Sequence, residues 1–154
     1  MRAYVRCLML AALTIPVGLW AADPAIGTWK LNVAKSKYDP GPAPKSATVT
    51  YAAHGEGITG TGQSVAADGT TTSMSYTASF DGKDAPVTGS PTYDTISLKR
   101  IDENTTESTL KKGGKVVSTA RRVVAKDGKT HTTTITGTNA DGKPMKNVAV
   151  YEKQ

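Results

Sequence analysis

The chain has 154 residues, a single cysteine and a formal net charge of +6 at pH 7. This length suits one domain rather than two, and the modest, interspersed positive charge argues against a nucleic-acid-binding protein. Large aliphatic residues are scarce and threonine is abundant. Because threonine is β-branched and fits a pleated surface, we expect a folded all-β domain with a thin, partly polar interior.

Residues 1–22 have the layout of a secretory signal peptide: a basic start, a short apolar run and a small-residue exit. The apolar run is shorter than the roughly 20 residues of a membrane-spanning helix, so an anchor is the less favoured alternative. We expect cleavage near Ala21 or Ala22 and a secreted or periplasmic domain of residues 23–154. That domain has no cysteine, and the loss of the two leader arginines lowers its net charge to +4.

Residues 25–33 alternate between apolar and polar side chains, as a strand with one buried face does. Gly27, Trp29 and Leu31 share one face. Trp29 is the only tryptophan of residues 23–154, so we expect the core to gather on it.

Residues 35–45 contain three prolines between positions 40 and 44. Prolines cannot donate to a strand ladder, and they favour an extended, polyproline-like path. We therefore expect a stiff connector here, with a lid over a cavity mouth as the alternative.

From Ser46 onward, alternating segments are separated by Asp-Gly or Gly-Gly pairs, which are strong hairpin signals because the primed turns need positive φ. A flat sheet of so many strands would expose two long edges, so we expect it to close, with Trp29 and Tyr151 on adjoining strands. The predicted strands are 46–53, 58–66, 71–80, a weak edge strand at 84–91, 93–101, 105–112, 115–125, 129–138 and 145–153. On the last of these strands both faces carry apolar residues, which leaves its inward register open.

The segment Gly27-Thr28-Trp29-Lys30-Leu31, the meander of Asp-Gly hairpins and the ending Val150-Tyr151-Glu152-Lys153 together resemble the calycins. These are the lipocalins and the intracellular fatty-acid-binding proteins. The resemblance implies a single up-and-down antiparallel barrel of 8–10 strands. It also implies that Gly27 and Trp29 close one end and that an apolar ligand enters at the other.

The chain departs from that family pattern in places that bear on ligand binding. Fatty-acid-binding proteins have two helices after the first strand, where this chain has only the proline loop. They also hold the ligand carboxylate with an R-x-Y on the last strand; here the tyrosine matches Tyr151, but Ala149 stands at the arginine position. A second family arginine falls near Arg121 and Arg122, and the sequence leaves open which of the two points inward.

Inward-facing positions on the predicted strands give a candidate ligand-binding site. Arg100 shares its parity with Ile96 and Leu98, which places it inside near a barrel end, where a buried guanidinium needs a partner or an anionic ligand. The candidate lining residues are Tyr51, Met74, Tyr76, Phe80, Ile96, Leu98, Arg100, Ile135 and Tyr151.

The sequence offers no constellation for catalysis or metal binding. His54 and His131 lack partners at a recognised spacing and are interpreted as ordinary surface or hydrogen-bonded residues. Residues 55–60 match G-x-G-x-x-G, but a strand follows instead of the helix that a dinucleotide site needs. We expect no catalytic residue, no metal and no cofactor.

Two functions remain open. The first is non-catalytic binding of a small, at least partly apolar molecule by a lipocalin-like barrel. The second is a structural or protein-interaction barrel, of an inhibitor type, whose own side chains fill the interior. The sequence leaves the oligomeric state open.

Overall fold

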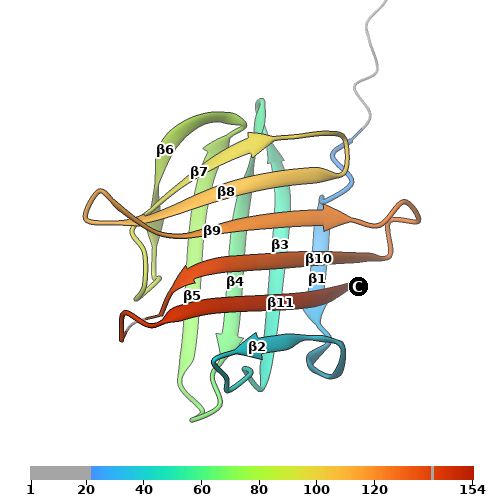
Figure 1. Cartoon of the computed structure of the whole chain (residues 1–154). Coiled ribbons are helices and arrows are strands. Elements are labelled where there is room, and N and C mark those ends of the chain that lie inside the picture. The colour runs from blue at the N-terminus through green and yellow to red at the C-terminus, as the bar shows by residue number, and fades with distance from the viewer. Residues whose placement is uncertain (1–21, 140) are drawn as a thin grey trace, which may run out of the picture.

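The computed structural model describes residues 22–139 and 141–154, which form one antiparallel sheet of eleven strands (Figure 1). The leader predicted at residues 1–22 lies almost wholly outside the described residues. The strands are β1 (Gly27–Leu31), β2 (Lys37–Asp39), β3 (Ser46–His54), β4 (Gly57–Val65), β5 (Thr71–Ser79), β6 (Asp81–Thr88), β7 (Thr95–Arg100), β8 (Thr105–Lys112), β9 (Lys115–Val124), β10 (Thr130–Thr138) and β11 (Pro144–Lys153).

Pairing between the first and last strands closes the sheet into a barrel. Trp29 lies opposite Lys153, and Leu31 lies opposite Tyr151. Ten strands, β1 and β3 to β11, follow one another in up-and-down order around the barrel. The all-β meander and the adjoining strands of Trp29 and Tyr151 are therefore confirmed.

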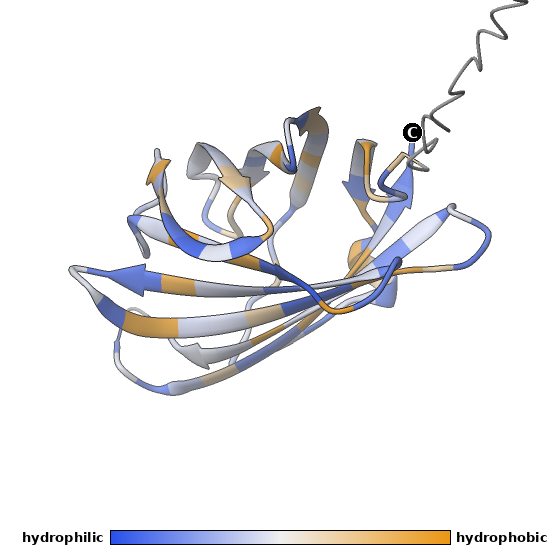
Figure 2. Cartoon of the chain, turned by 90° about the horizontal axis from the view of Figure 1, so that it is seen from above, coloured by the Kyte–Doolittle hydropathy of each residue, from blue (hydrophilic) through white to orange (hydrophobic). Residues whose placement is uncertain are grey.

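The barrel encloses its interior between two sets of strands. In Figure 1, β1, β3, β4 and β5 run behind β8, β9, β10 and β11 and cross them. Figure 2, seen from above, shows the ribbons wrapped around an interior, with hydrophilic and hydrophobic segments alternating along them. This alternation is the period-two pattern of strands that have one face inside and one face outside.

The segment predicted to be a stiff connector also contains regular structure. A short 3₁₀ turn, η1 (Val33–Lys35), is capped by the side chain of Asn32, and β2 follows it. β2 pairs with residues Lys146–Val148 of β11, while β1 pairs with the end of β11. Three residues have little strand signal of their own, so β2 exists because β11 offers it a free edge.

The weak strand predicted at 84–91 is β6, which begins earlier and is not an edge strand. It pairs with β7 along its length and with β5 only at Ser75–Thr88 and Tyr76–Val87. A register shift between Asp81 and Asp84 accompanies this irregularity. The seam between β5 and β6 is thus the least regularly paired part of the barrel.

Threonine holds the outer surface together, while a small number of apolar residues fill the inside. Cross-strand hydroxyl pairs join Thr28 to Thr50 at 2.9 Å and Thr59 to Thr77 at 2.8 Å. The main buried cluster consists of Ile58, Tyr76, Ala78, Val87, Ile96, Leu98 and Leu110. The thin, partly polar interior expected from composition is what the barrel has.

A second buried group, which we call the tryptophan cluster, consists of Ala25, Trp29, Val49 and Val124. Trp29 is fully buried, and its Nε1 donates to the carbonyl of Ala25 at 2.7 Å. The Lys153 ammonium lies 5.1 Å from the centre of the Trp29 ring.

Gly27 has a positive φ of 129°, a region that favours glycine. A Cβ at this position would lie 2.9 Å from Cε of Lys153. Gly27 therefore gives Lys153 the room to reach the tryptophan ring.

Candidate ligand-binding site

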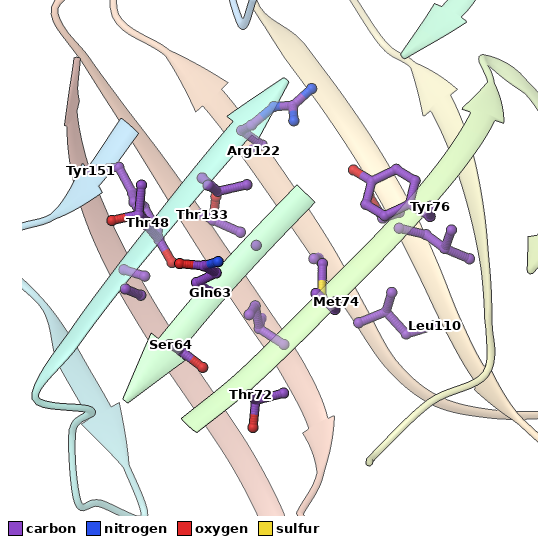
Figure 3. Close-up of a pocket in the computed structure, with 18 of the residues that line it drawn as sticks. Thr48, Gln63, Ser64, Thr72, Met74, Tyr76, Leu110, Arg122, Thr133 and Tyr151 are labelled. Atoms are coloured by element: carbon purple, nitrogen blue, oxygen red, sulfur yellow. The ribbon is translucent and has the colours of Figure 1, made fainter. Parts of the chain in front are cut away.

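The barrel interior contains a cavity of about 260 Å³ (Figure 3). Its apolar lining includes Met74, Ile96, Leu110 and Ile135. Every tyrosine of the described residues also lines it: Tyr38, Tyr51, Tyr76, Tyr93 and Tyr151. The interior is therefore not completely filled by the side chains of the barrel.

Six of the predicted site residues line the cavity, and three do not. The cavity-lining residues are Tyr51, Met74, Tyr76, Ile96, Ile135 and Tyr151. Leu98 is only 1% exposed in the main buried cluster, and Phe80 packs against that cluster. Side-chain parity predicts the inward face for these two residues. It does not predict their position along the barrel, and here the inward-facing strands extend beyond the cavity into the packed cluster.

Arg100 is the third predicted residue outside the cavity. Its guanidinium lies 4.1 Å from the centre of the Phe80 ring and is hydrogen-bonded to the carboxylate of Asp23. Its side chain is 34% exposed. The partner that a partly buried arginine requires is therefore supplied by the chain itself.

Arg122 is the arginine that faces the cavity. Arg122 is 7% exposed, its guanidinium carbon lies 4.2 Å from the centre of the Tyr51 ring, and Nη2 donates to Oγ1 of Thr106 at 3.4 Å. Among the described residues, no Asp or Glu lies within ion-pair distance of it. Arg121 points outward and binds the Glu107 carboxylate at 2.7 Å.

The register that the sequence left open is thus settled at β9. Arg122 shares its inward parity with Ala120, which lines the cavity, and with Val124, which is 3% exposed. That apolar alternation was the available signal for Arg122. On β11 it is Ala149 and Tyr151 that line the cavity.

The Arg122 guanidinium stays charged at neutral pH. Burial works to lower the pKa of Arg122, but the oxygens of Tyr51 and Tyr76 and the carboxylate of Asp23 raise it, and the net shift is upward. Burial also raises the pKa of Tyr93 to about 12 and raises the pKa of Tyr76. Neutral phenols can solvate the guanidinium but cannot neutralise it.

His131 is buried beside the cavity wall, which corrects the surface alternative for this residue. It is 1% exposed, stacks on Tyr151 with ring centroids 4.7 Å apart, and meets the Trp29 ring edge-on at 4.7 Å. Nδ1 lies 3.4 Å from Oγ1 of Thr133, and Nε2 has no hydrogen-bond partner. Burial, with a smaller contribution from Arg122, lowers the pKa of His131 to about 3, so the ring is neutral.

Glycines in β4 let two cavity side chains lie flat against the backbone. A Cβ on Gly60 would lie 2.6 Å from the Tyr76 ring, and one on Gly62 would lie 3.3 Å from Cγ of Met74. The hydroxyl of Tyr93 in turn donates to Sδ of Met74 at 2.9 Å. The absence of side chains at Gly60 and Gly62 of β4 therefore lets Tyr76 and Met74 pack against the β4 backbone, which leaves more room in the cavity.

Residues 22–139 and 141–154 contain no group of three or more His, Asp or Glu side chains placed to hold a metal ion. In the same part of the chain, no helix has the length and apolar character needed to cross a membrane.

Comparison with known proteins identifies the fold. No family model matches the chain, and no curated protein matches it. Among solved structures, the zebrafish ileal bile acid-binding protein complexed with cholic acid matches with a TM-score of 0.53 and 11% sequence identity. The match covers 85% of this chain and 99% of that one. The chain therefore has the calycin fold that its sequence motifs resemble.

Proposed function

We propose that this protein binds, without catalysis, a small amphipathic anion whose charged head lies on Arg122 and whose apolar part fills the cavity. The observation that carries the proposal is the burial of Arg122 on a cavity wall without a carboxylate partner among the described residues. A buried charge gains most from an opposite charge at hydrogen-bond distance, and a bound anion would supply the direct partner that the distant Asp23 carboxylate does not.

The rest of the cavity supports an apolar ligand of modest size. Met74, Ile96, Leu110 and Ile135 line the same cavity as Arg122. The volume of about 260 Å³ lies just under the usual range of small-molecule pockets, which favours a short chain or a compact ring system. A bile acid-binding protein with the same fold is consistent with this class of ligand.

The proposal includes export. A protein with the predicted leader at residues 1–22 and cleavage near Ala21 or Ala22 would act in the periplasm or outside the cell. Expression of the full chain, cell fractionation and N-terminal sequencing test this part separately. Recovery of the uncleaved chain in the cytosol would contradict it.

The binding proposal is tested with a fluorescent apolar probe and nonanoate as its competitor. Nonanoate should displace the probe from the parent protein, and Arg122→Gln should weaken nonanoate binding about tenfold or more, because a charge-assisted hydrogen bond is lost. Arg121→Gln is the matched control, since its guanidinium points outward one residue away. Failure of the parent to bind any amphipathic anion, with octyl sulfate tested beside nonanoate, or equal effects of the two variants, would refute the proposal.

A further inference from the structure

Hydroxyl side chains stand on the two strands that flank Arg122. Thr106 of β8 and Thr133 of β10 are its direct register partners on the two neighbouring strands. Thr106 is 6% exposed and accepts from the guanidinium, while Thr133 lines the cavity. Ser108, two residues along β8, lines the cavity as well.

The facing wall contributes two phenols. Tyr51 of β3 places its ring against the guanidinium, and Tyr76 of β5 lines the cavity opposite β9 and β10 (Figure 3). Both oxygens are near enough to Arg122 to raise its pKa. The polar groups near the guanidinium thus come from strands on both sides of the barrel.

We propose that the head group bound at Arg122 is a tetrahedral monoanion, a sulfate ester or a sulfonate, rather than a carboxylate. The inference rests on the proposed function. A carboxylate is planar and has two oxygens, which a guanidinium can satisfy through two parallel hydrogen bonds. A tetrahedral head has a third oxygen out of that plane, where Ser108, Thr133 and the phenols can donate to it.

The single positive charge of the site favours a head group with a single negative charge. Arg122 is the one guanidinium lining the cavity among the described residues, and neither the Tyr76 phenol nor the His131 ring is charged at neutral pH. A sulfate ester would leave the cavity neutral. A phosphate monoester, which is mostly dianionic, would bring an unbalanced charge into the interior.

The experiment compares head groups on chains of matched length. Octyl sulfate, octanesulfonate, octyl phosphate and nonanoate are titrated into the parent protein by calorimetry at pH 7.5. The sulfate and the sulfonate should bind about tenfold more tightly than nonanoate, because additional hydrogen bonds to a charged group form. Octyl phosphate should bind more weakly than octyl sulfate.

Two variants test whether the hydroxyl groups cause the preference for octyl sulfate over nonanoate. Ser108→Ala and Thr133→Val should each weaken octyl sulfate about fivefold or more and leave nonanoate within about twofold. Thr134→Val is the matched control, because Thr134 lies beside the outward-facing Arg121 and should change neither affinity. Thermal melting of each variant establishes that it is folded, and the two cavity variants serve as independent tests.

The outcomes separate this inference from the binding proposal. Nonanoate bound as tightly as octyl sulfate, or equal losses for both ligands in the hydroxyl variants, overturns the tetrahedral head group and leaves the anion-binding cavity standing. Tighter binding of octyl phosphate overturns the monoanion. Failure of all four ligands to bind the parent overturns both proposals.

Discussion

The surroundings of Arg100, beside the main buried cluster, and of Arg122, on the cavity wall, both include a stacked aromatic ring, but the two charges are balanced in different ways. Toward the N-terminal segment, Arg100 stacks on Phe80 and has the Asp23 carboxylate as its partner. In the cavity, Arg122 stacks on Tyr51, donates to the Thr106 hydroxyl, and has no carboxylate within ion-pair distance among the described residues. The same residue type on an inward face is thus structural where the chain supplies a carboxylate, and free to bind a ligand where it does not.

The largest expected effect tests the tryptophan cluster as a packing centre. Trp29→Ala should lower the free energy of unfolding by about 3–5 kcal/mol, because a fully buried indole and its hydrogen bond to Ala25 are lost. Urea unfolding measures the change. Val116→Ala, at a position that is 58% exposed, should change stability by no more than about 0.5 kcal/mol. Equal stability of Trp29→Ala and the parent would remove this role.

A second prediction concerns His131, which lies between Trp29 of the tryptophan cluster and Tyr151 of the cavity wall. Its folded-state pKa of about 3 is below the unfolded value of 6.5, so its stabilising contribution is complete above pH 6.5 and is lost as the pH falls toward 3. The expected loss between pH 7 and pH 5 is about 2 kcal/mol. His131→Phe, which keeps an aromatic ring on Tyr151, should flatten this part of the curve. Identical slopes for variant and parent would contradict the assignment.

Replacement of the cavity arginine should change ligand affinity far more than stability. Arg122→Met removes a buried charge that has no carboxylate within ion-pair distance, but it also removes the contacts with Tyr51 and Thr106, and these two effects oppose each other. The free energy of unfolding of the empty protein should therefore change by no more than about 1 kcal/mol, while the affinity for anions is lost. Urea unfolding without ligand measures the change. A loss as large as that of Trp29→Ala would show that Arg122 is part of the packed core.

The smallest effect is expected at the balanced arginine. Asp23→Asn should lower the free energy of unfolding by less than about 1 kcal/mol, since the Arg100 side chain is one-third exposed and solvent screens the pair. The difference should shrink further at high salt. A loss as large as that of Trp29→Ala would show that the N-terminal segment is an integral part of the core.

The sequence predicted the barrel because its turns are local. The glycine at the second position of each Asp-Gly or Gly-Gly pair has the positive φ that such a pair indicates; examples are Gly69, Gly114 and Gly128. The closing pair of strands followed from the cost of two open edges. β2 was missed because its pairing depends on β11, more than 100 residues away in the chain.

The site was predictable only in part. Alternation placed Tyr51, Met74 and Tyr76 on the inner face, but it could not show where along a strand the packed core ends and the cavity begins. Phe80 and Leu98 were predicted to line the cavity, but Leu98 lies in the packed core and Phe80 packs against it. No sequence pattern could show which arginine has a carboxylate partner, because Asp23 reaches Arg100 across 77 residues.

The shared strand β11 has a consequence for how the protein is made. β11 pairs with β10, β1 and β2, and Asn32 reaches Glu152 across 120 residues of chain. Such distant pairing is slow, because the intervening chain must first be brought together. Until β11 has left the ribosome, β1 and β10 have no neighbour on one side. Until then the unpaired edges of β1 and β10 are prone to aggregation, and the barrel can close only after β11 has been added.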